Sequence, residues 1–90
     1  MKADAQKVLP LLKTARGQLD KIIQMAQDDA YCLDISHQLL ACEGLLKKIN
    51  REVLGAHIES CVRDAFESGT QQEKNEKVNE LVELIGRMSK

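Results

Sequence analysis

The sequence is 90 residues long, carries a formal net charge of −1 and contains only two aromatic side chains. This length fits one domain, which we expect to span residues 1–90. The nearly balanced charge excludes the strongly basic composition of a typical nucleic-acid-binding domain, so any DNA-binding surface must be a local patch. No apolar run approaches the roughly 18 residues of a membrane-spanning helix, and no membrane partner is expected.

The composition predicts an all-α fold, because most residues are good helix formers such as Leu, Lys, Glu, Ala and Gln. A chain this short buries only about 60% of its unfolded surface, which favours a stable oligomer over a monomer. The three cysteines are an odd number and fall within helical sequence. We therefore expect free thiols in a reducing cytoplasm.

The first predicted helix ends near residue 26 and is amphipathic. Its apolar residues recur at spacings of three and four, the period of one helix face: Leu11, Leu12, Ala15, Leu19, Ile22, Ile23 and Ala26. Pro10 leaves the start of this helix open. Proline is tolerated in a first turn, but it also kinks a helix that begins earlier, near Asp4.

The second predicted helix is long and runs from about residue 30 to about residue 66. Asp28 or Asp29 is expected to cap its start, because a short carboxylate accepts hydrogen bonds from the free amides of a first turn. Gly69 is a natural terminator. All three cysteines and both histidines lie between these ends.

The third predicted helix begins at the sequence TQQE, residues 70–73. Thr70 and Glu73 are expected to form a capping box, in which each side chain accepts a hydrogen bond from the backbone amide of the other residue. One apolar stripe follows, made of Val78, Leu81, Val82, Ile85 and Met88. The chain is therefore predicted to be a three-helix protomer.

Metal-binding residue types occur at both ends of the second helix. His57 and Cys61 are four residues apart and project from one helix face, and a thiolate beside an imidazole suits Cu(I) or Zn(II). Cys32 is the obvious third ligand, yet a continuous helix would separate it from Cys61 by roughly 43 Å. If the helix is continuous, one chain cannot close this site. Two antiparallel copies can, because the start of one helix then lies beside the end of the other.

Two thiolates and one imidazole make a three-coordinate set, which is too few for structural zinc and favours Cu(I). Cys32 also lies at the positive end of the helix dipole, which favours the thiolate that a metal requires. The alternative is that these cysteines only pack, since a buried cysteine usually behaves as a small hydrophobe. Packing is our expectation for Cys42, which falls among leucines, and His37 is expected to be a packed or surface histidine.

The motifs RGQL (residues 16–19), YCLDIS (31–36) and HIESC (57–61) resemble the CsoR/RcnR family of bacterial metal-sensing transcriptional repressors. The resemblance extends over residues 13–88. It implies a three-helix protomer that pairs into an antiparallel four-helix-bundle dimer, and two such dimers that form a homotetramer.

The same resemblance implies a particular metal site. The copper branch of the family uses a trigonal Cu(I) site, here made of Cys32 from one protomer and His57 and Cys61 from the other. Nickel and cobalt sensors lack the second cysteine, which is present here as Cys61. Persulfide sensors lack the histidine, which is present as His57. The chain therefore matches the copper pattern best.

The family also has an outer shell around its metal. A tyrosine precedes the first cysteine, which corresponds to Tyr31, and a glutamate lies early in the third helix. Glu76 is our assignment for that carboxylate, with Glu73 as the alternative.

Family members bind operator DNA when metal-free and release it when metal binds. The resemblance assigns the DNA contacts to basic residues of the first two helices, here Lys13, Arg16, Lys47, Lys48 and Arg51. Asp20 stands where many relatives carry an arginine, which bears on DNA affinity and operator preference.

Two other functions stay open. One is a persulfide or thiol-redox sensor of the same family that uses Cys32 and Cys61. The other is a helical copper-binding protein that does not bind DNA. An enzyme is not expected, because the sequence offers no nucleophile–base pair, phosphate loop or acid pair in a credible pocket.

Overall fold

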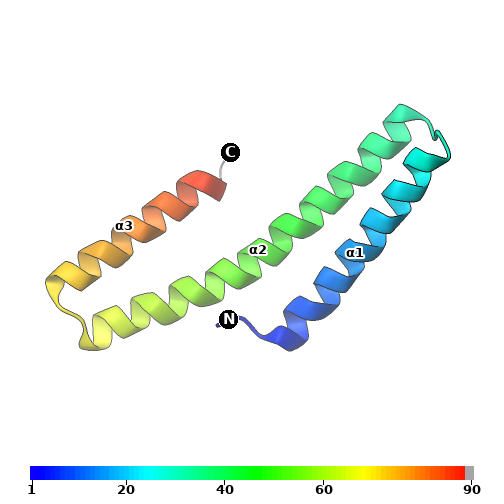
Figure 1. Ribbon diagram of the computed structural model, residues 1–90. Coiled ribbons are helices and arrows are strands. Elements are labelled where there is room, and N and C mark those ends of the chain that lie inside the picture. The colour runs from blue at the N-terminus through cyan, green and yellow to red at the C-terminus, as the bar shows by residue number, and fades with distance from the viewer. Residues whose placement is uncertain (89–90) are drawn as a thin grey trace.

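The computed structural model describes residues 1–88, which form three α-helices without a strand. α1 spans Ala5–Gln27, α2 spans Cys32–Ser68 and α3 spans Gln71–Met88. α1 runs back along the first half of α2 and α3 runs back along its second half (Figure 1), and within residues 1–88 α1 and α3 do not contact each other. The predicted all-α, three-helix protomer is confirmed. No helix in the described range has an apolar stretch long enough to traverse a bilayer.

The start of α1 settles the two alternatives that Pro10 left open. The Asp4 side chain accepts a hydrogen bond from the Gln6 backbone amide at 2.9 Å, so Asp4 is the N-cap and the helix begins at Ala5. Pro10 therefore lies inside the helix, where its missing N–H leaves one backbone carbonyl without its usual partner.

The expected cap of the second helix at Asp28 or Asp29 was wrong, because both aspartates terminate α1 instead. The Asp28 carboxylate accepts from the Gln24 side-chain amide at 3.1 Å, and its backbone amide donates to the Gln24 carbonyl. Asp29 has a φ of 54°, a left-handed conformation that Asp tolerates better than most residues and that stops the helix. Tyr31 is the N-cap of α2 and makes no side-chain capping bond.

α2 is one unbroken helix of 37 residues, and Cys32 is its first residue. At about 1.5 Å of rise per residue, Cys32 and Cys61 are roughly 43 Å apart along it, as the sequence predicted for a continuous helix. Gly69 follows its end and donates a backbone hydrogen bond to the Ala65 carbonyl at 2.8 Å.

The start of α3 is fixed by the predicted capping box, which is confirmed. The Thr70 amide donates to the Glu73 carboxylate at 3.3 Å, and the Glu73 amide donates to the Thr70 hydroxyl at 3.2 Å. Together with Gly69, this box sets the direction in which α3 returns along α2.

The core of one protomer is thin. Ala3, Val8, Ala15 and Ile49 form its main buried cluster, and the chain measures 58 × 28 × 13 Å. Cys42 is only 3% exposed, so the expectation that it packs is confirmed, while His37 lies at the surface. Large apolar side chains stay exposed along α1 and α2: Leu9, Leu12, Leu19, Ile23, Leu33, Leu39, Leu40 and Leu46. A surface of this kind favours burial against further copies of the chain.

Gly69 provides a test of the corner between α2 and α3. A Cβ at this position would collide with the Ala65 carbonyl oxygen and lie 2.9 Å from Glu73 Oε2. We expect Gly69→Ala to lower the free energy of unfolding by about 1–3 kcal/mol, because the backbone of the corner must shift. Urea unfolding followed by circular dichroism measures the change.

Gly86→Ala is the matched control, because a Cβ there meets nothing within 4 Å. It should raise stability by about 0.5–1 kcal/mol, since alanine favours a helix interior over glycine. Equal effects of the two substitutions would contradict the steric account of Gly69.

Candidate metal centre

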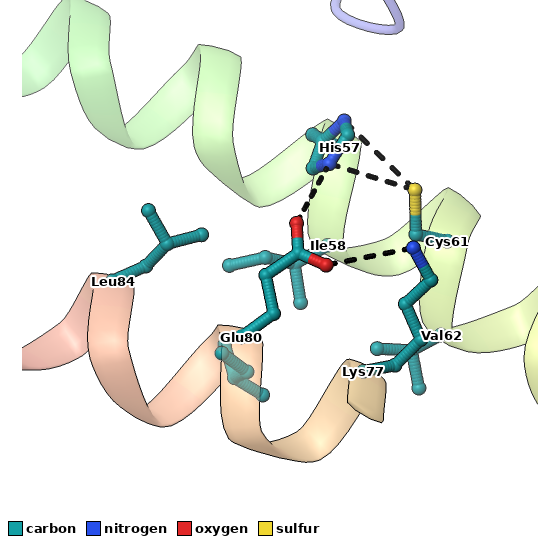
Figure 2. A pocket seen from close by; sticks show the side chains of 8 residues that line it. His57, Ile58, Cys61, Val62, Lys77, Glu80 and Leu84 are labelled. Carbon is teal, nitrogen blue, oxygen red and sulfur yellow. Dashed lines mark hydrogen bonds and ion pairs between the residues drawn. The ribbon is translucent and has the colours of Figure 1, made fainter. Parts of the chain in front are cut away.

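His57 and Cys61 lie together on the face of α2 that is turned toward α3 (Figure 2). Cys61 Sγ is 3.5 Å from His57 Nε2 and 3.9 Å from His57 Nδ1. Both side chains are half-buried, and they border a small cavity that Ile58, Leu81 and Leu84 close on its apolar side. The two candidate ligands are therefore already adjacent in one chain.

The spacing of this pair fits a shared metal ion. Metal–sulfur and metal–nitrogen bonds of about 2.3 and 2.0 Å place the two donor atoms about 3.5 Å apart at a tetrahedral angle and about 3.7 Å apart at a trigonal one. The observed separations of 3.5 and 3.9 Å bracket these values. Side-chain rotation alone can therefore seat an ion between imidazole and thiol, and a soft thiolate with an imidazole suits Cu(I).

Glu80 approaches the same imidazole from α3 (Figure 2). Its Oε1 lies 3.6 Å from His57 Nε2, and its Oε2 lies 3.5 Å from the Lys77 ammonium. A small rotation turns the first approach into a hydrogen bond from Nε2–H, which leaves the Nδ1 lone pair free for a metal. Glu80 is thus placed to hold the ring and select its tautomer.

The sequence analysis missed Glu80 and assigned this position to Glu76 or Glu73. Glu76 borders a neighbouring groove with Cys61 and accepts a hydrogen bond from Gln72 at 3.4 Å, while Glu73 belongs to the capping box. Their outer-shell roles stay predictions. The predicted apolar stripe of α3 gave no signal for Glu80, because its Val78, Val82 and Ile85 are exposed. The face that borders the cavity instead carries Leu81 and Leu84 beside Glu80.

The remaining predicted metal-site residues lie at the far end of the same helix. Cys32 is exposed, and Tyr31 is 65% exposed. Within residues 1–88 of one chain, no three metal-binding side chains come together as a site. Each end of α2 therefore carries an incomplete set of ligands.

The predicted DNA-contacting residues are all exposed on α1 and α2. Lys13 and Arg16 flank Ala15 on α1, and the α2 group, made of Lys47, Lys48 and Arg51, flanks Ile49. Ala15 and Ile49 belong to the same buried cluster between α1 and α2. Lys47 also pairs with Glu43 at 3.3 Å, an exposed contact of little energetic weight.

Comparison with known proteins identifies relatives over nearly the whole chain. The profile of a family described as metal-sensitive transcriptional repressor matches residues 4–87. The copper-sensing transcriptional repressor CsoR of Mycobacterium ulcerans (strain Agy99) is 42% identical over 74 residues, which are 82% of this chain and 61% of that protein. CsoR of Bacillus subtilis (strain 168) is 32% identical over 79 residues, which are 88% of this chain and 75% of that protein.

Two solved structures share the fold. The Cu(I)-bound copper-sensing repressor CsoR of Geobacillus thermodenitrificans NG80-2 aligns with a TM-score of 0.81 at 26% identity, covering 96% of this chain and 86% of that one. The nickel-responsive transcriptional regulator InrS aligns with a TM-score of 0.80 at 24% identity, covering 98% and 96% of the two chains. The InrS likeness supports the fold alone.

The position of Glu80 generates a prediction about metal affinity. Glu80→Gln keeps the shape of the side chain but weakens its hold on the imidazole, and loss of such a partner typically costs about 10–100-fold in metal affinity. Glu83→Gln is the control, because Glu83 pairs with Arg87 at 2.7 Å on the exposed side of α3. Anaerobic competition with a chromophoric Cu(I) chelator measures the Cu(I) affinity of each variant. Equal Cu(I) affinities of the two variants would show that Glu80 has no role in metal binding.

Proposed function

Because this chain belongs to the family of metal-sensitive transcriptional repressors, we propose that it binds operator DNA when metal-free and releases that DNA when Cu(I) binds. The observation that carries the choice of copper is the contact between His57 and Cys61, with Cys32 as a further free thiol on the same helix. An operator-bound repressor works beside the chromosome, so we assign the protein to the cytoplasm.

The proposed site is shared between two chains. Cys32 of one protomer joins His57 and Cys61 of its partner, which gives two sulfur donors and one nitrogen, a set that Cu(I) accepts. An antiparallel pair of α2 helices creates this site twice by symmetry. The length of α2 supports this arrangement, because a 37-residue helix cannot bring its own ends together.

The proposed assembly is a homotetramer, a dimer of dimers. Support comes from the exposed leucines of α2, which recur with a spacing of seven at 33 and 40 and at 39 and 46. Such a repeat places apolar side chains along one stripe, the pattern of helices that pack side by side. The exposed apolar face of α1 offers further surface for assembly.

The proposed DNA surface consists of the five basic residues on α1 and α2. Each ammonium or guanidinium can neutralise one phosphate and release its counterions. One protomer supplies few such contacts, and the chain as a whole has a net charge of −1. A tetramer repeats this basic surface four times, so its affinity for DNA exceeds the affinity of one protomer for DNA.

The proposed coupling acts through the shape of the assembly. Cu(I) ties the start of one α2 to the end of its partner and engages the imidazole that Glu80 of α3 approaches. Tyr31 precedes Cys32, so it shifts when Cys32 binds the metal. The metal stabilises the conformation of the assembly in which its ligands meet. If the spacing of the basic residues in that conformation no longer matches the phosphates of the duplex, the DNA is released.

A titration of DNA binding tests the function. Metal-free protein should bind a fluorescently labelled duplex from upstream of its own gene, and one Cu(I) per chain should lower this affinity by about tenfold or more. His57→Ala should bind the DNA but keep it when Cu(I) is added, whereas Cys42→Ala should respond as the unchanged chain does.

The alternatives give different outcomes in the same anisotropy experiment. A thiol sensor would release the DNA when a persulfide donor is added, and His57→Ala would still do so. Cu(I) would not release the DNA from such a sensor. Tight Cu(I) binding without DNA binding under any condition would identify a copper-binding protein that is not a repressor.

Subunit mixing tests whether the site is shared. Neither Cys32→Ala nor Cys61→Ala should bind Cu(I) tightly by itself. After the two variants are unfolded together and refolded in equal amounts, about half of the dimers are mixed, and each mixed dimer holds one intact site of two. We therefore expect about one quarter of the original Cu(I) capacity, measured by chelator competition. No recovery would contradict a shared site.

A further inference from the structure

Lys77 of α3 belongs to the surroundings of the His57–Cys61 pair. Its ammonium lies 3.5 Å from Glu80 Oε2, and the other oxygen of the same carboxylate faces the imidazole. Figure 2 shows the Lys77 side chain rising from α3 toward Cys61 of α2. Its side chain is 39% exposed, compared with 57% for Lys47 on the open surface of α2.

Lys77 is also the cationic side chain on the side of the site that holds Cys61. Among the described residues, it is the only lysine or arginine that borders either the small cavity between His57 and Cys61 or the adjoining groove beside Cys61, whereas Lys2 borders a separate pocket that His57 and Glu80 line without Cys61. The carboxylates that border the two are Asp64, Glu73, Glu76 and Glu80. Lys77 is therefore the one lysine among the carboxylates that border this cavity and groove.

The charge of the metal core decides what this ammonium does. Two thiolates and a neutral imidazole give a net charge of −1 with Cu(I) and of zero with Zn(II) or Ni(II). A positive charge nearby stabilises the first core relative to the second, and nearby carboxylates act in the opposite sense. The difference does not depend on the protonation of the metal-free thiols, because both metals start from the same metal-free protein.

We propose that Lys77 is a specificity-determining residue that favours a monovalent over a divalent metal ion at this site. It offsets the charge of Glu80, so that Glu80 can orient His57 without repelling the anionic Cu(I) core. This inference rests on the proposed function, because it assumes that Cys32, His57 and Cys61 bind the metal. It adds a residue, outside the ligand set, that sets the preferred ionic charge.

The test compares Cu(I) and Zn(II) affinities of the full chain, each measured anaerobically by competition with a chromophoric chelator. Lys77→Met should lower the ratio of Cu(I) to Zn(II) affinity by about tenfold, as expected for one elementary charge near a half-exposed site. Lys77→Gln should do the same, and Lys77→Arg should keep the ratio within about threefold because the charge is retained. The fall in the Cu(I) to Zn(II) affinity ratio should become smaller as sodium chloride rises from about 50 mM to about 500 mM, because salt screens the charge of Lys77.

Lys74→Met is the matched control. Lys74 lies on the same helix, but its ammonium stands over the Phe66 ring at 5.3 Å and borders neither the cavity nor the groove. Its loss should leave the ratio unchanged. An equal fall with Lys74→Met, or an unchanged ratio with both neutral Lys77 variants, would overturn the inference.

Cys61→Ala separates this inference from the proposed function. If Cys61→Ala loses tight Cu(I) binding while the Lys77 variants keep the original ratio, only the role of Lys77 is wrong. If Cys61→Ala binds Cu(I) as tightly as the unchanged chain, the proposed site and the role of Lys77 are both wrong.

Discussion

The unbroken length of α2 is the constraint on which the rest of this molecule depends. A helix fixes the distance between its ends through its rise per residue, and 37 residues without a break leave Cys32 far from His57 and Cys61. Under the proposed function, metal capture is therefore an event between chains. A bend at Gly44 or Gly55 would relax the constraint, but both glycines lie within continuous helix. Under the same proposal, the continuity of one helix makes quaternary structure responsive to a metal ion.

α3 gives the site its chemical character, although neither proposed thiolate lies on it. The corner at Gly69 and the capping box set the register of α3 against α2, and this register brings Glu80 to the imidazole and Lys77 to the cavity beside Cys61. Orientation of the ring and the local charge thus both depend on a helix joined by a short connection. Under the proposed function, a change in the length of that connection would alter metal binding without changing a proposed ligand.

Local features of the fold could be predicted from the sequence, and features set by packing between helices could not. Periodicity, the capping box at Thr70 and the buried Cys42 all depend on neighbours in the chain or on one helix face. Asp28 and Asp29 precede a helix and follow another, and only the left-handed backbone of Asp29 decides which helix they serve. Glu80 was missed for a related reason, since its contact with His57 depends on the register of α3 on α2. The link from Cys32 to the other two ligands requires a second chain and stays a prediction.

The thinness of the protomer makes concentration part of its stability. A body 13 Å thick, with leucines exposed along two helices, has little interior of its own, so association with further copies would add apolar burial that one chain lacks. Folding and assembly then share one equilibrium, whose midpoint moves with the amount of protein present. Under the proposed function, the two halves of each metal site lie on separate chains and share that dependence. The metal concentration at which such a protein responds would then depend on gene dosage and dilution as well as on ligand chemistry.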